Sequence, residues 1–199
     1  MATFSNEELI EGLKSGCEES FNQVFEAFHF RLYGFLLRLS GNADLATDLT
    51  QETWLRLVRA ARGLEANTSI FAWLITVARN LYISHYRSTL TEFEKWQRWK
   101  HPGPQPVHPP SPSPLEEAVA HETLDDIEQA FKDLPIHYRE VLLLVAVEGL
   151  SAKEVGRICG LRTATVRQRL HRARQHLLKQ LKQAGKRNCA LNAPPKCFG

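Results

Sequence analysis

The sequence predicts an all-α protein made of two small helical domains joined by a proline-rich linker. Apolar residues recur at steps of three and four along most of the chain, which is the spacing of an amphipathic helix. Residues 101–114 (HPGPQPVHPPSPSP) interrupt this pattern and hold seven of the ten prolines. We therefore expect one domain over residues 1–100, a linker over 101–114, a second domain over 115–185 and a flexible basic tail over 186–199.

The N-terminal domain is expected to be helical throughout. Apolar residues from Phe21 to Leu39 keep helical spacing, and Gly41-Asn42 ends that helix and starts another over 43–62. The apolar side of this second helix is formed by Leu45, Leu49, Trp54, Leu55 and Val58. Its polar side carries Asp44, Asp48, Gln51 and Glu52.

A further helix follows the loop of residues 63–67, and Thr68 or Ser69 can cap it. Its periodicity buries Phe71, Leu74, Val77, Ala78 and Leu81. The residues left for its surface are Arg79, Asn80, Tyr82, His85, Tyr86 and Arg87.

The proline-rich segment favours an extended conformation, in which fourteen residues at about 3.1 Å each reach roughly 40 Å. Ser113 and Pro114 then restart a helix, with serine as the cap and proline at the first helical position. Pro135 breaks that helix. The apolar segment from Ile136 to Glu148 is expected to be one helix that supplies the core of the second domain.

A helix-turn-helix pattern occupies residues 149–181. Ser151 and Glu154 have the spacing of a capping box, and Gly160 permits the positive φ that ends a helix. Leu161 falls in the turn, and Thr163 or Thr165 can cap a second helix. The buried face of this second helix is Val166, Leu170, Ala173, Leu177 and Leu181, and its polar face is Arg167, Gln168, His171, Arg172 and Gln175. In such motifs the second helix lies in the DNA major groove.

Charge separates this interpretation from a simpler one, in which the second helix is the solvated basic face of an ordinary helical bundle. Glu154 is the last acidic residue of the chain, and eleven lysines and arginines follow it. A solvated face normally mixes both signs, whereas a segment of one sign indicates phosphate binding. The net charge of +3 conceals this asymmetry. The sequence therefore favours DNA binding.

Other classes of protein are disfavoured. The four cysteines (17, 159, 189 and 197) have neither CxxC spacing nor a disulfide framework, so we expect free thiols, with Cys159 in a core. Cys189 and Cys197 have no histidine or acidic ligand cluster beside them. No catalytic triad, metal-ligand set or glycine-rich phosphate loop is present, which predicts a protein that is not an enzyme and has no cofactor. With neither a membrane-span-length apolar run nor a signal peptide, a cytoplasmic protein is expected.

Taken together, the two halves resemble the extracytoplasmic-function sigma factors, the small promoter-recognition subunits of bacterial RNA polymerase. In the N-terminal half, DLTQETWLRL (48–57) resembles the polymerase-binding segment of sigma region 2, and FAWLITVARNLYISHYR (71–87) resembles the segment that reads the −10 promoter element. In the C-terminal half, Asp133-Leu134-Pro135, Arg139-Glu140-Val141 and the whole helix-turn-helix resemble region 4. Both motifs in this order make the resemblance highly specific.

The resemblance implies roles for particular residues. Docking on the polymerase, through a coiled coil of its beta-prime subunit and the beta subunit, is implied for Asp48, Gln51, Glu52, Trp54 and Leu55. Contacts to the −10 element are implied for Arg79, Asn80, His85, Tyr86 and Arg87, and a pocket for a flipped base for Glu65, Asn67 and Thr68. Contacts to the −35 element are implied for Thr165, Arg167, Gln168, Arg169, His171 and Arg172. For Arg169 and for Arg174, binding to phosphates or to neighbouring helices is an alternative.

The resemblance also implies partners and control. The expected partners are core polymerase, promoter DNA and an anti-sigma factor, which in this family is often bound to the inner membrane and covers the polymerase-binding surfaces. Two rivals stay open at this point. A conventional helix-turn-helix repressor or activator would bind a palindrome tightly as a free dimer. A recombinase would need a serine nucleophile beside an arginine cluster, which the N-terminal half does not offer.

Overall fold

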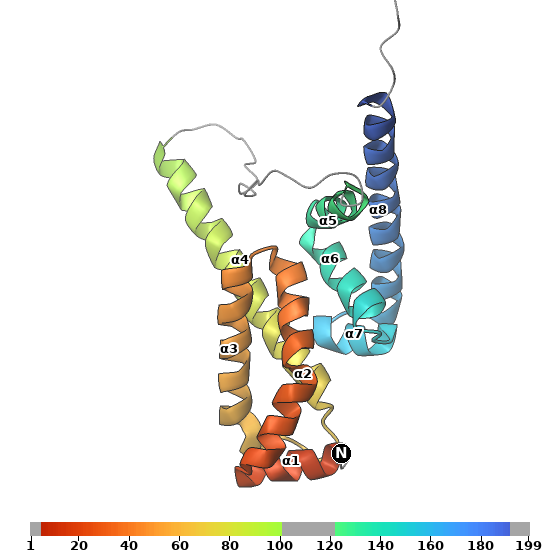
Figure 1. Cartoon of the computed structure of the whole chain (residues 1–199). Coiled ribbons are helices and arrows are strands. Elements are labelled where there is room, and N and C mark those ends of the chain that lie inside the picture. Colours follow the sequence, from red (N-terminus) through yellow and green to blue (C-terminus); the bar gives the residue numbers. More distant parts are fainter. Residues whose placement is uncertain (1–4, 101–121, 192–199) are drawn as a thin grey trace, which may run out of the picture. The chain divides into compact units, whose positions relative to one another are not determined.

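The computed structural model describes the backbone of residues 5–100 and 122–191 and the side chains of residues 5–91 and 127–182. Every regular element in these ranges is helical, which confirms the all-α prediction (Figure 1). The chain divides into two compact units, Met1–Pro110 and Ser111–Gly199. The predicted linker, the restart at Ser113 and Pro114, and Cys197 lie outside the described residues, as does the side chain of Cys189.

Within residues 5–100 the first unit contains five helical elements. They are α1 (Asn6–Ser15), α2 (Glu18–Ser40), α3 (Ala43–Ala60), the short 3-10 helix η1 (Ala61–Gly63) and α4 (Ile70–Lys100). The helices α2, α3 and α4 pack on one another, and α1 packs against α2 and η1. The fully buried side chains at their centre include Ile10, Leu32, Phe35, Leu36, Leu57, Leu74 and Ile75.

Local capping explains where these helices begin and end. The side chain of Asn42 accepts a hydrogen bond from the backbone N–H of Leu45 at 2.9 Å, directly after Gly41, whose φ of 68° ends α2. The hydroxyl of Ser69 accepts from the N–H of Ala72 at 3.4 Å, so Ser69 rather than Thr68 caps α4. The predicted breaks are therefore confirmed.

Three predictions about the faces of these helices are wrong. Leu55 and Val58 were assigned to the buried side of α3, yet both are exposed. Tyr82 was assigned to the surface of α4, yet it is buried. Helical periodicity fixes the angle between side chains but not how wide a face the neighbouring helices cover. Here α2 and α4 cover the side of α3 that carries Thr50, Thr53 and Trp54.

The second unit contains α5 (Glu122–Lys132), α6 (Ile136–Leu142), the π-helical turn η2 (Leu143–Val147), α7 (Ala152–Cys159) and α8 (Thr163–Leu191). The predicted break at Pro135 is confirmed. The expected single helix over 136–148 is α-helical only to Leu142, because it continues as the π turn. The helices α5, α6 and α7 each pack against α8 (Figure 1).

Two further findings concern the extent of the helices. The backbone of α8 stays helical to Leu191, so it continues past residue 185, where the predicted domain ended. In the part of the chain that is described, no helix combines the length and the apolar character needed to cross a membrane.

Candidate nucleic-acid interface

The helix-turn-helix begins with a capping box, as predicted. The Ser151 hydroxyl accepts from the Glu154 N–H at 3.3 Å, and the Glu154 carboxylate accepts from the Ser151 N–H at 2.8 Å. The hydroxyl and backbone N–H of Ser151 lower the pKa of Glu154, because both donate to its charged form. Gly160, with a φ of 66°, ends α7. The first half of the motif is therefore set by local chemistry.

The turn requires a second glycine that the sequence analysis missed. The backbone N–H of Leu161 donates to the Gly156 carbonyl at 2.8 Å, which folds the turn back onto α7. A Cβ placed on Gly156 would lie 2.7 Å from the carbonyl oxygen of Leu161, closer than such atoms approach in proteins. Only glycine fits without a shift of the backbone. Nothing in the local spacing marks this position, because the contact forms across the turn.

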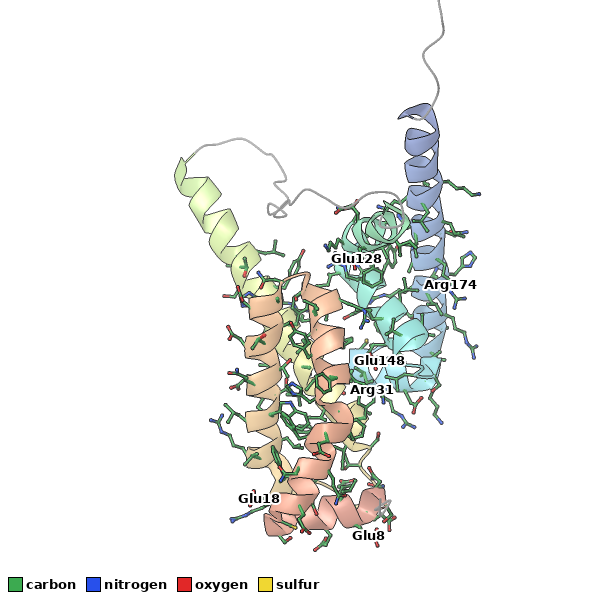
Figure 2. The ribbon with its side chains drawn as sticks, in the orientation of Figure 1. Glu8, Glu18, Arg31, Glu128, Glu148 and Arg174 are labelled. Atoms are coloured by element: carbon green, nitrogen blue, oxygen red, sulfur yellow. The ribbon has the colours of Figure 1, made fainter. Side chains whose placement is uncertain are left out.

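Most of the residues predicted to contact the −35 element lie on the outer side of α8. Arg167, Gln168, His171 and Arg172 are exposed, whereas Val166 and Ala173 are fully buried on the opposite side. Arg174 also projects from the exposed surface of α8 (Figure 2). Thr163 and Thr165 both lie within the first turn of the helix, so neither precedes α8 as its cap. The motif thus presents a polar, basic surface on an apolar support.

Arg169 differs from the other members of the predicted −35 set. Its guanidinium lies 3.6 Å from a carboxylate oxygen of Glu140 on α6, and its side chain is 29% exposed. Glu140 is only 2% exposed. Of the two alternatives for Arg169, the structure therefore shows contact with a neighbouring helix.

Arg139, next to Glu140 in α6, contacts the backbone that precedes this helix. Its guanidinium donates to the carbonyl oxygen of Leu134 at 3.1 Å and also to that of Lys132. Lys132 is the last residue of α5 and Leu134 lies in the turn that follows, where backbone acceptors lack helical partners. Arg139 thereby ties the end of α5 to the start of α6.

The predicted −10 residues lie on α4 between Arg79 and Arg87. Asn80, His85, Tyr86 and Arg87 are exposed, and Arg79 is half-buried. The guanidinium of Arg79 donates to the side-chain oxygen of Asn80 at 3.1 Å. Tyr82 instead lies in the core, with its ring centroid 6.2 Å from that of Tyr86. The helix therefore displays amide, imidazole, phenol and guanidinium groups together.

The loop before α4 is held by a residue of α1. Glu65 and Asn67 are exposed, and Thr68 is half-buried with its N–H donating to the Glu65 carbonyl at 2.9 Å. The side-chain amide of Asn6 donates to the Thr68 carbonyl at 2.8 Å. Asn6 is 62 residues away in sequence, which is why the sequence analysis did not connect it with the loop.

The predicted polymerase-docking residues separate into two groups. Asp48 and Gln51 are exposed on α3, Leu55 is 51% exposed, and Glu52 forms an ion pair with Arg56 at 2.8 Å. Trp54 is only 6% exposed. An apolar anchor must reach its partner, and of the two candidates, Leu55 and Trp54, only Leu55 is exposed. The Trp54 ring lies against Phe25, with a centroid distance of 4.9 Å, as part of the core.

Val58 is a second exposed apolar residue of α3. It is 57% exposed, and it lies three residues after Leu55 on the same helix, so the two side chains share a face. The outer face of α3 thus combines the acidic Asp48 with two exposed aliphatic side chains.

Comparison with known families identifies both units. Residues 24–90 match "Sigma-70 region 2", and residues 124–177 match "Sigma-70, region 4". The chain is 35% identical over 148 residues to the ECF RNA polymerase sigma factor EcfG of Rhodopseudomonas palustris, covering 73% of this chain and 76% of that protein. It is 31% identical over 161 residues to the ECF sigma factor SigE of Mycolicibacterium smegmatis, covering 79% and 60%.

Solved structures agree with this assignment. The sigma factor RpoE of Bartonella quintana, crystallised with the anti-sigma factor NepR, superposes with a TM-score of 0.65 at 27% identity, covering 82% of this chain and 98% of that one. CnrH, solved with the cytosolic domain of CnrY, has a TM-score of 0.67 at 20% identity, covering 89% and 97%, and supports the fold. The chain belongs to the extracytoplasmic-function sigma factors of RNA polymerase.

Proposed function

We propose that this sigma factor divides promoter recognition between its two units. The observation that carries the proposal is the outer surface of α8, where Arg167, Gln168, His171 and Arg172 stand together on a helix that directly follows a tight turn. Arginine and glutamine can each pair with two acceptor or donor groups on one base, which suits them to the major groove. The second unit would thus read the −35 element as duplex.

The first unit would act at the −10 element through α4. Asn80 offers an amide for a base edge, and Arg87 offers a charge for phosphate. Extruding a base from the stack costs a few kcal/mol, so a pocket must return hydrogen bonds to it. Glu65, Asn67 and Thr68 supply such groups in a loop that Asn6 holds against α1. The polymerase would supply the catalysis, and the sigma factor would act with it in the cytoplasm.

Docking on core polymerase is assigned to the outer face of α3. Asp48 and Gln51 suit a basic partner surface, and Leu55 with Val58 supplies the apolar contact area that stable interfaces need. The beta-prime and beta subunits are the expected partners.

Control by an anti-sigma factor is proposed from a relative. RpoE of Bartonella quintana, which shares 27% identity with this chain over nearly its whole length, was crystallised with the anti-sigma factor NepR. We infer a comparable inhibitor here. Whether it is bound to the membrane is a separate question, which co-fractionation of the two proteins would answer.

Run-off transcription with purified core polymerase tests the proposal. The wild-type chain should direct initiation from a family-type promoter, and Arg172→Ala should lower it while core binding persists. Asp48→Arg should weaken core binding itself, and Glu26→Arg, the same charge change at an exposed position of α2, serves as its control. Failure to bind core polymerase, or tight binding to a palindrome as a free dimer, would instead support a conventional repressor.

A further inference from the structure

The contact between Glu140 and Arg169 joins two helices of the DNA-binding unit. Other ion pairs, such as Arg56–Glu52 and Lys132–Glu128, link residues four apart on one exposed helix. Such pairs add little to stability, because water already solvates both charges. Glu140 is different, since its side chain is 3% exposed and its partner lies on α8. A buried carboxylate has to be compensated by the protein.

The Tyr138 ring of α6 also lies beside the His176 ring of α8, with centroids 5.5 Å apart, and the remaining core around the ion pair is apolar. The core cluster consists of Leu134, Leu142 and Ala173, with Phe131, Tyr138, Leu170 and Leu177 packed around it. On α8 this cluster includes the small Ala173, fully buried. Apolar burial depends on area rather than on angle, so a small rotation of α8 about its axis would change it little. An ion pair, by contrast, depends on the distance between two particular groups, so a rotation of α8 that separates the Arg169 guanidinium from the buried Glu140 carboxylate leaves that charge uncompensated.

The position of Arg169 connects that restraint with DNA reading. It lies between the exposed pair Arg167 and Gln168 and the exposed pair His171 and Arg172. Any rotation that carries Arg169 away from Glu140 turns these four side chains by the same angle. Base readout depends on donor and acceptor positions along the groove edge, and it is therefore sensitive to such a rotation.

We propose that Arg169 is a positioning residue: through Glu140 it fixes the rotation of α8 against α6, so that the neighbouring side chains meet the −35 bases, and it does not itself bind DNA. This inference rests on the proposed function of α8. It is supported by His137, one turn before Glu140, whose pKa is lowered by burial and then by the charge of Arg169, as a guanidinium turned toward α6 requires.

Glu140→Gln distinguishes this role from a direct phosphate contact. If Arg169 bound DNA, removing its acidic partner would leave binding unchanged or raise it. If Arg169 positions the helix, the variant should lower the preference for a matched over a scrambled −35 element by about fivefold or more, the effect of losing one base contact. The assay is run-off transcription by the full-length chain with core polymerase, on two promoters that share one −10 element.

Further variants complete a double-mutant cycle with its controls. Arg169→Gln should lose the same preference, the double variant should lose little more than either single one, and Arg169→Lys should restore part of it. Glu128→Gln, the same acid-to-amide change in the exposed α5 pair, should leave the preference unchanged. The salt dependence of promoter binding should keep its slope in Arg169→Gln, because no phosphate contact is lost.

The outcomes separate the two proposals. A wild-type chain with no −35 preference would overturn the proposed function and this inference with it. A wild-type preference that survives Glu140→Gln and is lost, with a smaller salt slope, in Arg169→Gln would overturn the positioning role alone. If Glu140→Gln does not fold by circular dichroism, the salt slope and the recovery by Arg169→Lys decide between the roles.

Discussion

Among the described residues, the polar side chains classed as buried are Thr50 and Thr53 in the first unit and Glu140 in the second. The two threonine hydroxyls donate to the carbonyls of Ala46 and Leu49 in their own helix, each at 2.7 Å. They need nothing from another helix. Glu140 is compensated from α8. The first unit therefore hides its polar groups locally, while the second uses one to join two helices.

The two units also differ in their apolar cores, because the first contains more large buried side chains than the described part of the second. Fully buried large side chains in the first unit include Phe35, Leu36 and Leu74, and aromatic pairs such as Phe28 with Phe71, 5.3 Å apart, join its helices. In the second unit the described ones are Leu134, Leu143 and Leu144. A smaller domain buries a smaller fraction of its surface, so directional contacts carry more of its helix orientation. The unit that we propose reads duplex DNA is thus the one in which an ion pair joins two helices.

The largest effect is expected from the core of the first unit. Phe35→Ala removes a fully buried ring and should lower the free energy of unfolding of that unit by about 3–5 kcal/mol. Phe30→Ala on the same helix is the matched control, because Phe30 is 82% exposed, and it should cost less than about 0.5 kcal/mol.

Tryptophan fluorescence during urea unfolding measures this effect selectively. All four tryptophans, at positions 54, 73, 96 and 99, belong to the first unit. Amide exchange in α7 and α8 reports the second unit in the same samples. If Phe35→Ala lowered protection in both units equally, the division into two separately stable cores would be wrong.

The next largest effect concerns the turn of the second unit. Gly156→Ala places a methyl group against the Leu161 carbonyl and should cost about 1–3 kcal/mol, because the obstacle is backbone and cannot rotate away. Gly160→Asn is the comparison, since that position has open space and asparagine tolerates a positive φ. Amide exchange in α7 and α8 measures both variants. Equal losses would show that the close approach at Gly156 is not what the turn requires.

A smaller effect is expected from the serine N-caps that both units contain. Ser5 and Ser151 each cap a helix, and each hydroxyl accepts from a backbone N–H at 3.3 Å. Ser5→Ala and Ser151→Ala should each cost about 1 kcal/mol, the first seen by fluorescence and the second by exchange. The same absolute loss should be a larger fraction of the second unit's free energy of unfolding. If the loss were the same fraction in both units, the second unit would not be the less stable of the two.

These differences also explain which parts of the structure could be predicted. Two capping boxes (Ser5 with Glu8, and Ser151 with Glu154), Gly160 and the break at Pro135 are each encoded within a few neighbouring residues, and the sequence analysis found all of them except the box at Ser5. Gly156, Asn6 and the Glu140–Arg169 pair were missed, because their contacts join residues that only the fold brings together. Trp54 and Leu55 are adjacent, and the sequence treated both as docking anchors. The packing of α2 and α4 decided that one is core and the other surface.

The smallest effect we expect concerns pH in the second unit. Burial, and then the charge of Arg169, lowers the pKa of His137 from its usual 6.5. The folded unit therefore binds a proton less readily than the unfolded chain. It follows that stability rises with pH through the interval just below 6.5 and is lost on acidification. His137→Gln should flatten this dependence, as amide exchange in α6 and α8 between pH 7 and 5 would show. Because the burial that lowers this pKa is only partial and the His137 side chain stays exposed to solvent, the change should be smaller than that of either cap. An unchanged slope in His137→Gln would assign the acid sensitivity to another group and weaken the view that charge, more than apolar packing, sets the orientation of α8.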